Sequence, residues 1–154
     1  MPRRVRTITP NELARRRGFA SGIELAVQEH LKSHNIEVQY EPFKIPYQQP
    51  RIFKYTPDFV LPNGIIIETK GYFDSDDRVK HLLIQSQHPD LDIRFVFDRA
   101  SNKLNKNSTT TYAIWCDKHG FKWAAKLVPM EWMNEKKNER RIDAIKALNT
   151  NEKA

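Results

Sequence analysis

Apolar residues recur at helical spacing in three parts of the chain. Ile23, Val27 and Leu31 would stack on one face, which predicts a helix from about residue 21 or 22 to residue 34. A second amphipathic stretch follows Ser75, a suitable N-cap, and a short helix is expected over 111–119, ended by Gly120. A weaker amphipathic pattern predicts a helix around 142–148.

Strand-like stretches alternate with these helices. Residues 53–61 and 65–70 predict two strands closed by Pro62-Asn63-Gly64, because an Asn-Gly pair tolerates the positive φ of a tight hairpin. Further strands are expected at 93–97 and 123–128, with a mobile polar loop from 98 to 110. With no internal repeat, this alternation predicts an α/β or α+β class.

The segment 36–51 has apolar residues typical of extended chain, but it is interrupted by prolines. Pro42, Pro46 and Pro50 lack the N–H that a central strand must donate to its neighbours. We therefore expect an edge strand, an arm or a crossover connection.

Charge divides the 154 residues into three regions of one domain. The net charge is +7, yet residues 18–133 carry 14 basic and 14 acidic side chains. Residues 1–17 hold six Arg and one Glu, and the charged tail 134–154 contributes the remaining +2. We predict a flexible basic arm over 1–17 that contacts nucleic acid through Arg15, Arg16 and Arg17, the alternative being a solubilising tail.

Several classes of protein are excluded by composition. No apolar run approaches the roughly 20 residues that span a bilayer, and no signal-peptide core follows the N-terminal arginines. The single cysteine, Cys116, cannot form an intramolecular disulfide, which indicates a reducing cytoplasm. Its spacing from His119 is better explained by helix packing than by zinc, which needs four ligands.

Ionisable residues gather on the predicted hairpin. Asp58 lies on its first strand, and Glu68-Thr69-Lys70 ends its second. Period two places Glu68 and Lys70 on one face and Thr69 on the other, while pairing across the turn brings Asp58 alongside. The two carboxylates and the carbonyl of Thr69 offer an oxygen-only site suited to Mg²⁺, with Mn²⁺ expected to substitute. Ordinary surface charges are the alternative for any one of these residues, but three together favour a site.

Such an ion would lower the pKa of a water and neutralise charge on a phosphorane and its leaving oxygen. Lys70 supplies a further cation, which would orient the attacking water or help to deprotonate it. The residue types do not decide between these roles.

The residues Pro57-Asp58 and Glu68-Thr69-Lys70 resemble the PD-(D/E)xK nuclease signature. The segments TPDFVLPNGIIIETKG, SDDRVKHLLIQSQHPDLDIRFVF and KHGFKWAAKLVPMEW closely resemble endonuclease I of T-odd coliphages, and the likeness runs from about Ser21 to Trp132. It implies a restriction-endonuclease-like mixed sheet flanked by helices. It also implies a phage-encoded, metal-dependent Holliday junction resolvase acting in the host cytoplasm as a domain-exchanged homodimer.

The resemblance also implies roles for individual residues. Glu24, in SGIELAVQEHL, completes the catalytic set with Asp58, Glu68 and Lys70. The exchange would pass through the segment 36–51 and place Glu24 beside the partner's Asp58. A two-fold dimer is also the economical way to make two symmetric cuts with one site per chain.

Other interpretations stay open. Arg78, Lys80 and His81 are candidate phosphate contacts, or are simply solvated. The chain would alternatively be another PD-(D/E)xK enzyme, restriction-like or transposon-end-cleaving, although no base-reading element is evident. A non-enzymatic basic DNA-binding protein is a weaker alternative, because clustered carboxylates repel phosphate unless a metal is present.

Overall fold

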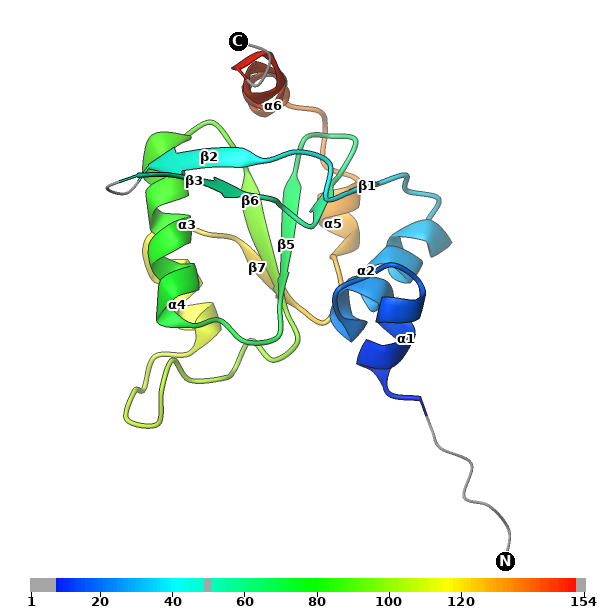
Figure 1. The fold of residues 1–154 in the computed structure, drawn as a ribbon, viewed down its shortest axis with the longest axis vertical. Helices are drawn as coiled ribbons and strands as arrows, with labels where there is room; N and C mark the ends of the chain where they lie inside the picture. The colour runs from blue at the N-terminus through cyan, green and yellow to red at the C-terminus, as the bar shows by residue number, and fades with distance from the viewer. Residues whose placement is uncertain (1–7, 49–50, 152–154) are drawn as a thin grey trace, which may run out of the picture.

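The computed structural model describes residues 8–48 and 51–151. At its centre is a five-stranded mixed sheet in the order β1-β4-β5-β6-β7, with helices on both faces (Figure 1). The predicted α/β class with a mixed, helix-flanked sheet is therefore confirmed. The strands are β1 (Gln39–Tyr40), β4 (Phe59–Val60), β5 (Ile66–Lys70), β6 (Ile93–Phe97) and β7 (Trp123–Ala125).

The directions of the strands change at β5. The pairs β1/β4 and β4/β5 are antiparallel, whereas β5/β6 and β6/β7 are parallel. The parallel pairs require crossovers, which are supplied by α3 (Ser75–Gln87) and α4 (Tyr112–His119). The remaining helices are α1 (Pro10–Arg16), α2 (Gly22–Ser33), α5 (Met130–Met133) and α6 (Glu139–Asn151).

The predicted hairpin is present, but its first strand is broken. Phe59 pairs with Ile67 and Val60 with Ile66, and the turn places Gly64 at φ +91°. Upstream of Asp58 the chain leaves this sheet: β3 (Ile52–Tyr55) pairs instead with β2 (Ile45–Gln48) in a separate two-stranded sheet. The single strand predicted over 53–61 is thus wrong. The interruption falls at Pro57, which has no N–H to donate to a ladder.

The segment 36–51 supplies the edge strand β1 and the outer strand β2. Pro46 is accommodated in β2, in a sheet of only two strands. The expectation of an edge element is confirmed for β1.

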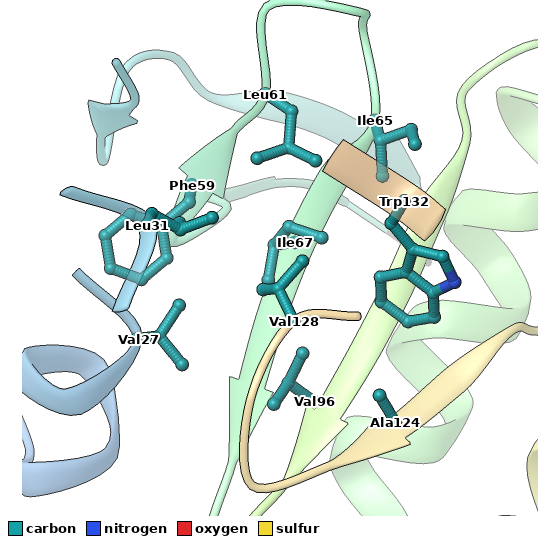
Figure 2. Close-up of a cluster of buried hydrophobic side chains, with 10 residues drawn as sticks. All are labelled: Val27, Leu31, Phe59, Leu61, Ile65, Ile67, Val96, Ala124, Val128 and Trp132. Carbon is teal, nitrogen blue, oxygen red and sulfur yellow. The ribbon is translucent and has the colours of Figure 1, made fainter. Parts of the chain in front are cut away.

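The two faces of the main sheet are covered differently. Figure 2 shows the cluster on one face, where side chains of α2 and α5 pack against β4, β5 and β6. On the opposite face Ile66 and Ile93 pack with Ile84 of α3 and with residues of β2 and β3. Alternation along β5 therefore buries Ile66 and Ile67 on opposite sides, and every residue of the strand except Lys70 is buried.

Local differences from the sequence predictions have identifiable causes. The helix α1 was not expected, yet Thr9 and Glu12 form a capping box and Pro10 occupies its first position. The arm predicted over 1–17 therefore carries a helix over Pro10–Arg16, while residues 1–7 lie outside the described residues. Asp74 rather than Ser75 caps α3. The loop expected to be mobile is held by a bridge between Lys103 and Thr111.

Two further predictions concern the helices. Gly120, at φ +78°, ends α4 as expected. Among the described residues, no helix is long and apolar enough to cross a bilayer.

Candidate active site

Asp58 lies at the break between β3 and β4, where hydrogen bonds hold both its side chain and its main-chain carbonyl. Its Oδ2 accepts hydrogen bonds from the amide of Thr69 at 2.8 Å and from the hydroxyl of Thr69 at 2.7 Å. Its carbonyl accepts a hydrogen bond from the amide of Glu41 at 2.8 Å. Asp58 is buried, and these bonds fix one oxygen while leaving Oδ1 without a bond to the backbone of β5.

Glu68 and Lys70 share one face of β5, as period two predicts. Lys70 Nζ lies 3.8 Å from Glu68 Oε1 and 3.3 Å from Asp77 Oδ1 on α3. The other carboxylate oxygen of Glu68, Oε2, accepts a hydrogen bond from the hydroxyl of Tyr55 on β3. Glu68 is thus fixed between a neutral donor and a cation.

Glu24 approaches the same region from the first turn of α2. Its Oε2 accepts hydrogen bonds from the amide of Ala20 at 2.8 Å and from the hydroxyl of Tyr40 at 2.7 Å. Glu24 is buried and close enough to raise the pKa of both Asp58 and Glu68. The structure therefore brings Glu24, Asp58, Glu68 and Lys70 together within one chain.

Burial sets the electrostatics of the two central carboxyl groups. It raises the pKa of Asp58 to about 7, against the hydrogen bonds from Thr69, and it raises the pKa of Glu68 to about 8, against the attraction of Lys70. Burial would also lower the pKa of Lys70, but Glu68 and Asp77 outweigh it and hold that pKa above its ordinary value. Lys70 is therefore a protonated cation in this arrangement.

The donor set fits a hard divalent cation. Within residues 8–48 and 51–151, no group of three or more His, Cys, Asp or Glu side chains is arranged to hold a metal ion. Asp58 and Glu68 are nevertheless two buried carboxyl groups whose pKa values are raised chiefly by burial, although Lys70 and Lys80 attract Glu68, so both are undercompensated when ionised. With a backbone carbonyl such as that of Thr69 they offer the oxygen ligands that Mg²⁺ accepts alongside water.

The candidate DNA contacts fall into two groups. Arg15 and Arg16 are exposed on α1, and Arg17 follows them with an ion pair to Glu29. Arg78 donates to the carbonyl of Phe73 at 2.7 Å and is half-buried.

Lys80 and His81 have structural contacts on α3. Lys80 pairs with Asp77 and lies over the ring of Tyr55, 5.1 Å from its centroid. His81 is fully buried between Tyr55 and Phe95, and neither of its ring nitrogens has a hydrogen-bond partner among the residues that the structure describes. The structure therefore places His81 in the core and not on the surface where a phosphate contact was expected, because α3 turns that position toward the sheet.

Sequence reasoning missed Tyr55, Tyr40 and Asp77. Tyr55 precedes the motif in a stretch that alternation predicts as one continuous strand, so its contact with Glu68 depends on a break that period two does not reveal. The interpretation of Cys116 as a packing residue is confirmed: it is buried in the core, where burial raises the pKa of its thiol to about 12.

Comparison with known proteins bears directly on this arrangement. The family profile described as "Phage endonuclease I" matches residues 7–152. The chain belongs to this family. It is 53% identical over 129 residues to "Endonuclease I" of Escherichia phage T7, covering 83% of this chain and 87% of that protein. It is also 53% identical over 131 residues to "Endodeoxyribonuclease 1" of Enterobacteria phage T3, covering 84% and 86% respectively.

The resemblance noted in the sequence is confirmed by these matches. The family match begins before α1 and includes all of α6, so it extends well beyond the span from Ser21 to Trp132 on which the resemblance rested.

Proposed function

We propose that this chain is a metal-dependent, structure-selective deoxyribonuclease that hydrolyses phosphodiester bonds in branched DNA, four-way junctions included. The observation that carries the proposal is the convergence of Glu24, Asp58, Glu68 and Lys70 in a member of the phage endonuclease I family. Both named relatives are endonucleases, and the name of one specifies DNA as the substrate.

Asp58, Glu68 and the carbonyl of Thr69 would hold the divalent ion, Mg²⁺ or Mn²⁺. When bound, such an ion neutralises charge on the phosphate and lowers the pKa of water. The hydrogen bonds from Thr69 and Tyr55 fix the orientation of the two carboxylates that would bind it. The Lys70 ammonium, kept protonated by Glu68 and Asp77, then orients the attacking water or stabilises developing negative charge.

Selectivity for branched DNA is proposed to depend on shape and on phosphate contacts. The exposed Arg15 and Arg16 of α1, with Arg17 beside them, are candidate backbone contacts, as are the partly exposed Arg78 and Lys80. An alternative is another PD-(D/E)xK endonuclease with the same site but sequence-dependent cutting.

We further propose a two-fold homodimer in which the part containing α2 is exchanged. The strands β2 and β3 are antiparallel, pair Gln48 with Ile52, and are separated by only three residues. If the connection between them were extended, β2 of one chain would pair with β3 of the other in the same register. Glu24 would then complete the partner's site.

The test is cleavage of a synthetic four-way junction and of its linear duplex arms at equal concentrations. We expect cuts in the junction with Mg²⁺ and none in EDTA, with little dependence on the base sequence at the branch. Equal cleavage of the junction and the duplexes would contradict structure selectivity, and cleavage in EDTA would contradict the metal.

A further inference from the structure

A basic surface lies next to the catalytic lysine and has no part in the chemistry described above. The connection from β6 to α4 begins with Asp98, which pairs with Lys126, and continues through residues 99–111, which contain Arg99, Lys103 and Lys106 and no Asp or Glu. The body from 18 to 133 has no net charge, so this run of positive charge is a local feature. Its asparagine, serine and threonine side chains add groups that can donate hydrogen bonds to phosphate.

Tyr72 stands at the edge of this surface with 73% of its area exposed. It is two residues beyond Lys70, so the two Cα atoms are no more than about 7 Å apart. The next residue, Phe73, is fully buried, its amide donates to the hydroxyl of Tyr112, and its carbonyl accepts from Arg78. The exposed ring is therefore presented from a firmly anchored turn.

The ring and the loop border a common depression of about 680 Å³. The loop residues that line this depression include Asn102, Lys103, Asn105 and Lys106. Because β5 and β6 are parallel, the turn after β5 and the loop after β6 leave the sheet at the same end, as Figure 1 shows. The bridge between Lys103 and Thr111 holds the loop in place.

We propose that Tyr72 and residues 99–111 form a nucleotide subsite, in which the ring stacks on an unpaired or unstacked base and the lysines contact the flanking phosphates. An exposed aromatic ring beside basic side chains is the chemistry that binds single-stranded nucleic acid. A base inside a continuous duplex is stacked on both faces, whereas a base at a branch point offers a free face. The subsite therefore deepens the proposed function, on which it rests, by supplying a reason for branch selectivity.

The two parts of the subsite make separable predictions for binding in EDTA. Tyr72→Ala should weaken binding of a four-way junction about tenfold, and of a linear duplex less than twofold, because only the junction offers a base face. Tyr72→Phe keeps the ring and should bind both as the wild type does. The double variant Lys103→Ala/Lys106→Ala should weaken the binding of both junction and duplex. The slope of log affinity against log salt concentration should become shallower by about 0.9 for each phosphate that is no longer neutralised.

Lys137→Ala is the matched control, since it removes one exposed lysine from the connection between α5 and α6. A 2-aminopurine at the branch should change its fluorescence when wild type or Tyr72→Phe binds, and should not do so with Tyr72→Ala. Thermal unfolding verifies that each variant is folded.

The subsite is overturned if Tyr72→Ala binds the junction as tightly as the wild type does, or if the substitution weakens the binding of junction and duplex equally. These failures are distinguishable from failure of the proposed function. If the wild type cleaves junctions and Tyr72→Ala binds them as tightly as the wild type, only the subsite is contradicted. If the wild type cleaves no DNA with Mg²⁺, the proposed endonuclease function is contradicted.

Discussion

The hydroxyl of Tyr55 donates a hydrogen bond to Glu68 across two different sheets. Tyr55 ends β3 of the two-stranded sheet, and Glu68 lies within β5 of the main sheet. The ring of Tyr55 is buried, with the ring of His81 edge-on at 4.9 Å between centroids. Tyr55 is thus a positioning residue for a proposed metal ligand.

Tyr55→Phe should leave the fold intact, because the ring contacts remain, but should weaken binding of the divalent ion about 10- to 100-fold. Calorimetric titration with Mn²⁺ measures that binding directly, and the Mg²⁺ dependence of cleavage should shift by a similar factor. High Mg²⁺ should recover most of the rate. Unchanged Mn²⁺ affinity would show that the hydrogen bond has no positioning role.

Asp58→Asn and Glu68→Gln should each reduce cleavage on the order of 100- to 1,000-fold or more. DNA affinity should stay the same or rise. A rise is expected above about pH 8, where both carboxyl groups are ionised and each substitution removes negative charge that repels phosphate. Lys70→Ala should likewise lower the cleavage rate more than the affinity.

Gel-shift titration in EDTA and single-turnover cleavage with Mg²⁺ separate these quantities. Asp76→Asn is the matched control, as an exposed aspartate in the first turn of α3. Wild-type cleavage by either carboxylate variant would contradict the assigned site.

The sequence predicted which side chains of the hairpin lie together better than it predicted their surroundings. Glu68 and Lys70 follow from period two alone, because β5 is a regular strand whose face is fixed by its neighbours. The contact of Asp58 with Thr69 depends instead on how the chain turns at Pro57 between two sheets. Such a turn depends on tertiary packing, and the periodicity of apolar residues in the sequence does not reveal it.

Two helices illustrate the same limit. The capping box of Thr9 and Glu12 can be recognised in the sequence, but the cluster of arginines favoured the prediction of a flexible arm over that of a helix. The basic neighbours of His81 favoured a surface position, whereas its burial depends on β3 lying over α3, which periodicity in α3 does not specify.

A buried ionic cluster fastens the C-terminal segment to the main sheet. Arg94 on β6 is 1% exposed and pairs with Asp92 and Glu135 at 2.8 Å each, while Arg141 of α6 joins the same two carboxylates. The hydrogen bonds from Arg94, aided by Arg141 and opposed by partial burial, lower the pKa of Glu135 from 4.5 to about 2.

Because folding depresses this pKa, the stabilisation is complete above about pH 4.5 and is lost as the pH falls toward about 2. Glu135→Gln should therefore lower the free energy of unfolding at pH 7 by only about 1 kcal/mol, because water screens the 36% exposed side chain of Glu135 and Asp92 still compensates Arg94. The difference from wild type should shrink between pH 4.5 and pH 2. Urea unfolding across this range measures it.

Glu131→Gln serves as the control, since Glu131 is an exposed glutamate on the neighbouring α5. A difference between Glu135→Gln and wild type that stays constant down to pH 2 would contradict the assigned role of the charge.

Exchange between protomers is tested by complementation. Within one chain, Glu24 lies close enough to Asp58 to influence its pKa, so a complete site can be built from a single chain. An exchanged dimer would build the same site from Glu24 of one chain and Asp58, Glu68 and Lys70 of the other. The two arrangements differ in which chain supplies α2, and one mixed dimer distinguishes them.

We expect the variants Glu24→Gln and Asp58→Asn each to be inactive alone. For the test, the two variants are mixed, unfolded and refolded together. In an exchanged heterodimer one site collects both lesions and the other is intact, so nicking of one strand should return. With sites built within single chains every site keeps a lesion, and the mixture stays inactive. Different affinity tags on the two variants isolate the heterodimer, so that its activity is measured without either homodimer. An isolated heterodimer that does not nick would therefore rule out exchange.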